Sequence, residues 1–364
     1  MAAYYQDKAA SLADIFGAPS VMVEEDRVHV GSRTYPIVDD VIVVLDPARY
    51  PPRLRRRLGN FGGSPPAASE LFSESIQHTF GAEWQAFPDL LQEHEDEFGQ
   101  YFDLVELEDL EQARVADLGC GAGRWSYFLK SRCRELVLVD FSEAIFVARL
   151  NLRDCSSAIF VMGDITQLPF RKDFADLVVC LGVLHHLPVP ALDMVRRLAD
   201  LSPHALVYLY YALDNRTAHF RLLLGAVTAA RMLTSRVRSP CARAAISWVG
   251  TAGVYVPLVA AGSLLMRLGL GGLVPLHDTY RGKSFGRMRQ DVYDRFFTRI
   301  EQRFSRDQVL ELRDTFSEVR VSAGLPYWHF LCIRTSGRLS PAEVGGVPGG
   351  AGRGGSRKSG EYRP

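Results

Sequence analysis

Three glycines at alternate positions, Gly119, Gly121 and Gly123, constrain the fold of this chain more than any other feature. A short apolar stretch ending in Asp117 precedes them, and a helical pattern begins directly after them. Because glycine has no Cβ, such positions permit a left-handed turn from strand to helix and let a ligand lie against bare backbone. The start of the following helix offers free N–H groups to a polar group. The loop alone also fits a tight turn in any α/β protein.

Three further apolar stretches end in residues that suit a nucleoside ligand. Residues 136–142 read as a buried parallel strand that ends in Asp140, 23 residues after Asp117. An acid at that place can accept hydrogen bonds from both hydroxyl groups of a ribose. Residues 158–170 read as a third strand followed by Asp164, and residues 176–188 as a fourth strand followed by a loop.

These four motifs, in this order, resemble those of class I S-adenosylmethionine-dependent methyltransferases. The resemblance implies an α/β fold, with a Rossmann-like sheet of seven strands that ends in an antiparallel hairpin. It also implies an enzyme whose cofactor is S-adenosylmethionine. In this family the acid after the third strand accepts from the adenine amino group, and the loop after the fourth strand closes over the methionine part. The cofactor-binding residues implied here are Asp117, Gly119, Gly121, Gly123, Asp140, Phe141, Asp164, Ile165 and Leu181.

The composition of the chain divides it into segments around this core. We predict that residues 1–20 form a loosely attached helix. A capping box, Ser305 with Gln308, predicts where the last helix begins. The predicted segments are an N-terminal extension with a β-hairpin (1–45), a linker (46–69), a helical lid (70–112), the methyltransferase core (113–212 and 301–335), a helical insertion (213–300) and a disordered tail (336–364).

Residues 35–40, YPIVDD, resemble the end of a zinc-ribbon segment that precedes many bacterial methyltransferase domains. That segment carries cysteines at the positions that Val28 and Gly31 occupy here. The six cysteines of the chain are scattered without a C-x-x-C pair, which argues against a cysteine zinc site and a disulfide framework. We therefore expect no metal and a hairpin that is structural or docks a partner. The first 16 residues lack signal-peptide features, so we expect a cytoplasmic location.

The segment before the glycine loop carries apolar residues at helical spacing, among them Ile76, Phe80, Trp84 and Phe87. In small-molecule methyltransferases a segment of this form is a lid over the cofactor cleft. Trp84 and Phe87 fit the role of core anchors equally well, so both interpretations stay open.

The insertion combines positive charge with a long apolar run. From Arg216 to Leu276 the chain has seven arginines and no acidic residue, and 23 uncharged residues separate Arg243 from Arg267. A membrane span needs about 20 apolar residues, but a single crossing would separate the last two strands from their sheet. We therefore expect a buried cap over the substrate pocket or an interfacial membrane contact through 216–276, peripheral on the inner face of the cytoplasmic membrane. A helical wheel places five arginines on one face: Arg221, Arg231, Arg236, Arg238 and Arg243.

Two sets of polar residues are candidates for chemistry on the acceptor. His185 and His186 follow the fourth strand, and either can serve as a general base for a hydroxyl or phenol proton. The alternative is that His185 packs and His186 caps the loop. Where the insertion returns to the core, residues 275–285 offer an acceptor-binding loop whose default interpretation is a solvated turn. Its candidate residues are His277, Tyr280 and Arg281.

The formal net charge of zero and the missing base-methyltransferase motifs disfavour nucleic acid as a partner. The fourth strand is not followed by an Asn- or Asp-Pro-Pro-aromatic run, and Cys241 lies in the insertion, where it is expected to be structural. We predict methyl transfer from S-adenosylmethionine to oxygen or carbon of a small apolar or lipid-linked metabolite. Two alternatives remain: a cofactor-binding scaffold without catalysis, and an RNA methyltransferase, which the arginine run at 53–57 would support. The sequence makes no prediction of the oligomeric state.

Overall fold

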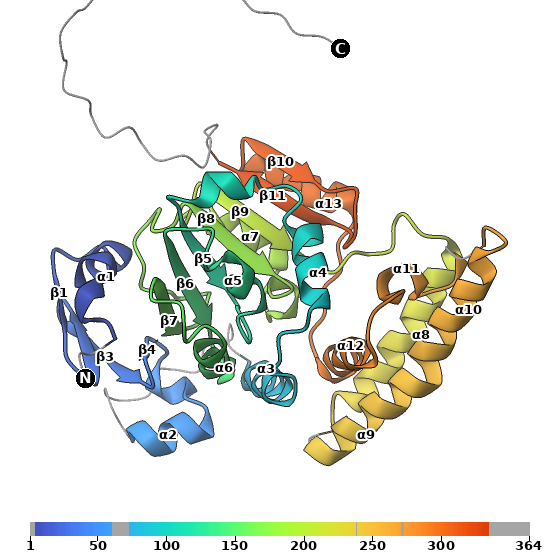
Figure 1. Cartoon of the computed structure of the whole chain (residues 1–364), viewed down its shortest axis with the longest axis horizontal. Helices are drawn as coiled ribbons and strands as arrows, with labels where there is room; N and C mark the ends of the chain where they lie inside the picture. Colours follow the sequence, from blue (N-terminus) through green and yellow to red (C-terminus); the bar gives the residue numbers. More distant parts are fainter. Residues whose placement is uncertain (1–3, 60–72, 238, 271–272, 335–364) are drawn as a thin grey trace, which may run out of the picture.

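The computed structural model describes residues 4–59, 73–237, 239–270 and 273–334 (Figure 1). Arg238, residues 60–69 of the predicted linker and the predicted disordered tail therefore lie outside the described residues. The described part contains one sheet of eleven strands, in the order β1-β2-β3-β4-β7-β6-β5-β8-β9-β11-β10. The α/β class predicted from the sequence is confirmed.

Seven of these strands form the sheet that the resemblance implies. Five are parallel and two close the sheet in an antiparallel hairpin. The parallel strands are buried on both faces, which explains their continuous apolar sequences. Chain order reverses at the central strand β5, so a crevice opens at the carboxyl ends of the strands there. The bounds are β5 Arg114–Leu118, β6 Glu135–Asp140, β7 Ala158–Met162, β8 Leu177–Leu181, β9 His204–Tyr208, β10 Glu318–Val321 and β11 His329–Ile333.

The N-terminal extension is part of the same sheet, which corrects the predicted count of seven strands. It forms β1 (Val21–Val23), β2 (Arg27–Val30), β3 (Arg33–Val38) and β4 (Val41–Val43), and β4 pairs in parallel with β7. The prediction of a loosely attached N-terminal helix is also wrong. Helix α1 (Ala9–Phe16) buries Leu12 and Ile15 completely in the core, because its apolar face packs on this widened sheet.

Helices cover both faces of the sheet. On one face lie α1, α7 (Ala191–Leu198) and α13 (Arg306–Leu310), whose apolar residues share one core cluster. The capping box predicted at the start of α13 is confirmed, with Ser305 Oγ accepting from the Gln308 backbone N–H at 3.2 Å. The other face carries α2 (Pro52–Leu58), α4 (Glu93–Tyr101), α5 (Arg124–Leu129) and α6 (Ala144–Asn151). The short 3₁₀ turns are η1 (Gln6–Lys8), η2 (Pro47–Arg49), η3 (Leu107–Leu110), η4 (Leu184–His186) and η7 (Glu311–Asp314).

The insertion forms a helical unit beside the sheet, and Figure 1 shows α8 running antiparallel to the joined α9 and α10. The single helix Pro240–Met266 is long and apolar enough to cross a membrane by length and composition alone. Only 17% of its most apolar 18-residue segment is buried. The helix is therefore not the buried cap that was one of the two expectations for the insertion. The elements are α8 (Ala218–Thr234), α9 (Pro240–Gly250), the π-helix η5 (Thr251–Tyr255), α10 (Val256–Met266), α11 (His277–Tyr280) and α12 (Phe285–Phe297).

The prediction that five arginines share one face of the insertion is wrong for two of them, which are buried. Arg231 is buried in an ion pair with Glu301, and Arg243 is buried over the ring of Phe297 at 5.2 Å. Both side chains turn toward the core because carboxylate, carbonyl and aromatic partners lie there. Arg221 and Arg236 are exposed, as the prediction required.

Candidate active site

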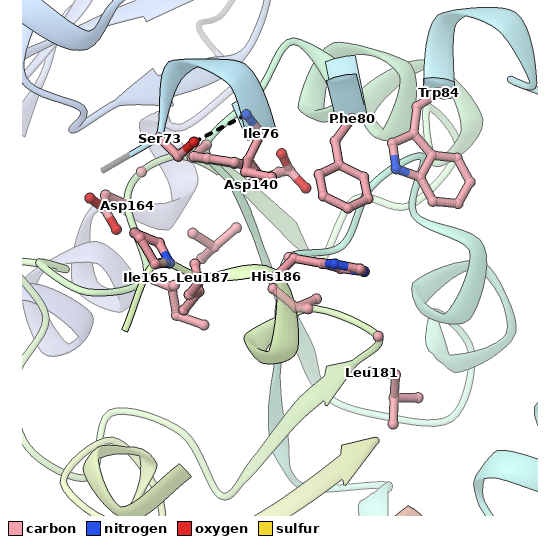
Figure 2. A pocket seen from close by; sticks show the side chains of 17 residues that line it. Ser73, Ile76, Phe80, Trp84, Asp140, Asp164, Ile165, Leu181, His186 and Leu187 are labelled. Atoms are coloured by element: carbon pink, nitrogen blue, oxygen red, sulfur yellow. Dashed lines mark hydrogen bonds between the residues drawn. The ribbon is translucent and has the colours of Figure 1, made fainter. Parts of the chain in front are cut away.

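A first pocket opens at the carboxyl ends of the parallel strands, beneath helix α3 (Glu74–Ala86) (Figure 2). It holds about 790 Å³ of space that is not filled by atoms, part of it open to solvent. Its lining is Ser73, Ile76, Phe80, Trp84, Gly119, Val139, Asp140, Phe141, Gly163, Asp164, Ile165, Leu181, Gly182, Val183, His186, Leu187 and Pro188.

The glycine loop forms one wall of the first pocket and could carry no side chain. Gly119 has φ +80°, and a Cβ there would lie 2.4 Å from a methyl group of Val183. Gly121 has φ +54°, and its Cβ would lie 2.5 Å from the indole of Trp84. Gly119 lines the pocket, whereas Gly121 and Gly123 shape the turn without lining it. The backbone at Gly119 is therefore bare toward a ligand.

Asp140 presents a fixed carboxylate to the first pocket from the end of β6. Its Oδ2 accepts from the Gly121 backbone N–H at 3.0 Å, and its Oδ1 accepts from the backbone N–H and the hydroxyl of Ser142. Burial raises the pKa of this carboxyl, and the hydrogen bonds from Ser142 and Gly121 oppose that rise. Oδ2 accepts one of these bonds and keeps a second lone pair, so a hydroxyl group in the pocket can donate to Asp140.

Asp164 also lines the pocket, but part of its carboxylate is already engaged. Arg49 Nη1 donates to Asp164 Oδ2 at 2.7 Å, and the backbone N–H of Thr166 donates to Oδ1 at 2.9 Å. Arg49 belongs to η2, within the segment predicted as a linker, and the sequence analysis missed it. The Asp-Pro pair at 46–47 predicts a turn at this place. It gives no sign that Arg49 contacts Asp164, which lies 115 positions further along the chain. The other three predicted residues at this end, Phe141, Ile165 and Leu181, line the pocket.

Asp117 does not line the first pocket. It belongs to β5 and its side chain is buried. Ser126 of α5 donates from Oγ to Asp117 Oδ2 at 2.7 Å. Burial raises the pKa of Asp117 to about 7, and the hydrogen bond from Ser126 opposes this rise. The structure thus gives Asp117 a role in joining the strand to the helix after the glycine loop.

Helix α3 supplies the apolar roof of the first pocket. Ile76, Phe80 and Trp84 line the pocket from one face of the helix, as Figure 2 shows. Gln77 fastens the helix above the site, since its Nε2 donates to the Phe141 carbonyl at 2.7 Å. Phe87 instead packs on Tyr293 of α12, with ring centroids 5.8 Å apart. The geometry supports a lid at Trp84 and a core anchor at Phe87.

Of the two candidate bases, His186 lines the first pocket. Its Nδ1 lies 2.8 Å from the carbonyl oxygen of Ile300. A carbonyl only accepts, so Nδ1 carries the hydrogen and Nε2 of the neutral ring keeps its lone pair. Nε2 has no hydrogen-bond partner among the described residues and lies 3.9 Å from Asp294 Oδ1. Phe80 covers the ring, with centroids 5.2 Å apart.

His185 lies behind His186 and outside the pocket lining. Its ring stacks on Tyr210 with centroids 4.0 Å apart, and neither ring nitrogen has a hydrogen-bond partner within the described part of the chain. Burial lowers its pKa well below the usual value, which keeps the ring neutral. The structure therefore places His185 as packing for Tyr210 and His186.

A second pocket lies between the end of β9 and the insertion, with about 1070 Å³ of space that is not filled by atoms, part of it open to solvent. Of the three predicted acceptor-binding residues, only Tyr280 lines it. His277 is buried against α10, where a Cβ on Gly262 would meet its ring at 2.5 Å. Arg281 is exposed, with Nη1 3.0 Å from Met266 Sδ.

The two pockets lie on opposite sides of one pair of rings. His186 lines the first pocket, Tyr210 lines the second, and their centroids are 5.4 Å apart. Tyr210 Oη donates to Asp294 Oδ2 at 2.5 Å, and Asp294 also lies beside His186. The sequence analysis missed Tyr210 and Asp294, because they are 84 residues apart and no motif links them.

Comparison with known families finds a match in the part of the chain that forms much of the first pocket. Residues 115–202 match the family model described as a methyltransferase domain. This range includes the glycine loop, Asp140, Asp164 and His186. This segment of the chain, residues 115–202, therefore matches a methyltransferase domain. A search of curated proteins finds no match to the chain.

Solved structures with similar folds come from several bacteria. The YcgJ protein of Bacillus subtilis is 23% identical, with a TM-score of 0.32 over 38% of this chain and 59% of that protein. A methyltransferase dependent on S-adenosylmethionine from Aquifex aeolicus is 18% identical, with a TM-score of 0.30 over 35% of this chain and 70% of that one. The N-methyltransferase NodS of Bradyrhizobium japonicum, in complex with S-adenosylhomocysteine, is 19% identical, with a TM-score of 0.28 over 36% and 71%. The chain thus spans less than two thirds of the length of the Bacillus subtilis protein.

Proposed function

We propose that this chain transfers a methyl group from S-adenosylmethionine to oxygen or carbon of a small apolar or lipid-linked acceptor. The observation that carries the proposal is the pairing of a bare glycine loop with the fixed carboxylate of Asp140 in one pocket. Bare backbone and an acceptor for hydroxyl groups are what a nucleoside cofactor needs. The residues present in the first pocket therefore fit the cofactor of this class.

Different residues of the first pocket would bind the cofactor, exclude water and remove a proton from the acceptor. S-adenosylmethionine, when bound, would supply a methyl group that passes from its sulfonium sulfur to the acceptor atom, with S-adenosylhomocysteine as the leaving group. Asp140 would hold ribose hydroxyl groups, and Asp164 and Ile165 would hold the adenine end. The lid residues Phe80 and Trp84 would exclude water and restrict the reactants to a productive orientation. Where the acceptor arrives as a hydroxyl or phenol, His186 Nε2 is the candidate base.

The outer face of the insertion supports an apolar or lipid-linked acceptor. Among the described residues, every exposed large apolar side chain except Met22 and Leu150 lies between Leu222 and Phe285. Such a concentration marks an interaction surface. Arg221 is exposed on α8, Arg236 and Arg267 are exposed just after the ends of α8 and α10, and no acidic residue lies between Arg216 and Leu276. We infer that this face rests on an anionic membrane surface, from which the acceptor reaches the site.

Two members of the exposed arginine run offered in support of RNA make contacts within the protein. Arg57 pairs with Asp39, and Arg55 donates to the carbonyl oxygens of Ala48 and Tyr50, each at 3.2 Å. These contacts fix part of the run against its own fold. They favour the small-molecule acceptor over RNA.

Calorimetric titration of S-adenosylmethionine and S-adenosylhomocysteine tests the proposed cofactor site. We expect micromolar binding to the wild type and at least tenfold weaker binding to Asp140→Ala, which corresponds to about 1.4 kcal/mol. Asp154→Ala is the matched control, because Asp154 is an exposed acid paired with Lys130 far from the pocket lining. Absence of binding to the wild type would overturn the proposal. Binding without methyl transfer to any component of a lipid extract would favour the scaffold alternative.

A further inference from the structure

Three guanidinium groups line the second pocket, and only two of them have a carboxylate partner. Arg216 Nη2 donates to Asp278 Oδ2 at 3.0 Å, and Arg303 Nε donates to Glu301 Oε1 at 2.6 Å. Arg295 of α12 forms no hydrogen bond and no ion pair with any other described residue, and its Nε atom is buried without a partner. The side chain as a whole is half-buried, and burial of a guanidinium nitrogen without a partner is unfavourable.

The surroundings of Arg295 do not neutralise it. Tyr210, Tyr255 and Tyr280 lie near it, and burial raises the pKa of each phenol, so these groups stay uncharged. The nearby carboxylate of Asp291 is engaged elsewhere, since it accepts from Arg287 and from the Tyr280 hydroxyl. The second pocket therefore keeps a positive charge that its own residues leave unpaired.

The walls of the second pocket beyond these arginines are mostly apolar. They come largely from α8, η5 and α10, and two of the lining residues, Leu223 and Val254, are also among the exposed apolar side chains. A pocket with a charged end and long apolar walls suits a molecule with a charged head and an apolar chain. The apolar lining residues are Leu213, Phe220, Leu223, Leu224, Val227, Val254, Leu258, Val274, Pro275, Leu276 and Phe296.

We propose that the second pocket binds an anionic amphiphile, with its phosphate or carboxylate group at Arg295 and its apolar chain against α8 and α10. The inference that this amphiphile is the methyl acceptor rests on the proposed function. It follows from the position of the pocket, because Tyr210 in its wall touches His186 in the wall of the first pocket.

Binding of small soluble amphiphiles tests the site without the need to know the natural acceptor. Octyl phosphate, octanoate, octyl glucoside and inorganic phosphate are each titrated calorimetrically into the full chain, below micelle-forming concentrations. We expect octyl phosphate or octanoate to bind the wild type at least tenfold more tightly than Arg295→Gln, about 1.4 kcal/mol. Arg289→Gln is the matched control, because Arg289 lies on the same helix but does not line the second pocket. Arg295→Lys, which keeps the charge, should restore part of the affinity.

The outcomes of these titrations test the anionic group, the role of Arg295, the role of the apolar walls and the proposed function separately. The stronger of octyl phosphate and octanoate identifies the anionic group. Octyl glucoside should bind wild type and Arg295→Gln alike, because it lacks the charge that Arg295 recognises. Equal affinity of both anionic probes for wild type and Arg295→Gln would overturn the site, and equally tight inorganic phosphate would overturn the role of the apolar walls. S-adenosylmethionine is titrated into the same proteins. If it fails to bind while octyl phosphate binding still depends on Arg295, the proposed function fails and the anion site stands.

Discussion

The ring of His186 is oriented by one hydrogen bond, from Nδ1 to the carbonyl of Ile300 at 2.8 Å, and Nε2 is left with its lone pair. If this nitrogen removes the acceptor proton, His186→Ala should lower the turnover number by about 10²–10⁴-fold, the usual contribution of a general base. S-adenosylmethionine affinity should change little. Formation of S-adenosylhomocysteine with a lipid extract, measured beside calorimetric titration, checks both expectations. His29→Ala, on β2, is the control. Unchanged turnover in His186→Ala would show that the acceptor needs no base from this residue.

Asp117 makes a prediction about stability, also at the scale of one residue. Its folded pKa of about 7 lies above the value of about 3.9 for an unfolded carboxyl. The folded state therefore holds the proton more tightly, and the free energy of unfolding falls as pH rises from about 4 to about 7. Between about pH 5.5 and pH 8 the fall should be about 2 kcal/mol and should vanish in Asp117→Asn. Urea unfolding at the two pH values measures it, with Asp154→Asn as control. The same fall in wild type and Asp117→Asn would contradict the assignment.

At the scale of single elements, helix α3 covers the first pocket with Ile76, Phe80 and Trp84. The indole lies against the glycine loop, close enough that a Cβ on Gly121 would overlap it. We expect Trp84→Ala to weaken S-adenosylmethionine binding about tenfold, about 1.4 kcal/mol, because the pocket loses its apolar roof. Phe87→Ala, three residues along the same chain segment, should leave this affinity unchanged since Phe87 packs on Tyr293. Calorimetric titration compares the two variants, and equal affinities would argue that α3 is not a lid.

Elements that local signals define were predictable, and those that depend on distant contacts were not. The glycine loop, the acid at the end of β6 and the capping box of α13 are read from adjacent residues. The parallel pairing of β4 with β7 joins Val41 to Phe160, and no local pattern announces it. The same reason hid the ion pair of Arg49 with Asp164 and the hydrogen bond of Tyr210 with Asp294. Each of these contacts is created by the topology of the whole sheet.

At the scale of the whole molecule, the insertion has two faces with different tasks. Its inner face supplies Asp294, Arg295 and the apolar walls of the second pocket. Its outer face exposes the apolar side chains of α8 and α10. The ion pair of Arg231 with Glu301 and the contact of Lys283 with Glu97 at 3.0 Å tie this unit to the core. An acceptor taken from a membrane would then have a short path to His186.

The outer face predicts binding to anionic membranes. We expect the chain to sediment with vesicles that contain phosphatidylglycerol, less at high salt because screening weakens the attraction of exposed arginines such as Arg267. The triple variant Leu222→Ser, Leu264→Ser, Leu268→Ser removes three of the most exposed apolar side chains. Full burial of one such side chain in the membrane is worth about 1.5–3 kcal/mol. Loss of all three should therefore weaken vesicle binding more than tenfold.

The matched control for this membrane experiment is the double variant Met22→Ser, Leu150→Ser, which removes the two exposed large apolar residues that the described part of the chain has outside the insertion. It should sediment like the wild type, because β1 and α6 lie on other parts of the molecule (Figure 1). Equal loss in both variants would indicate a nonspecific apolar effect. A wild type that stays in solution with anionic vesicles would separate the acceptor from the membrane, and the second pocket would then have to take its amphiphile from water.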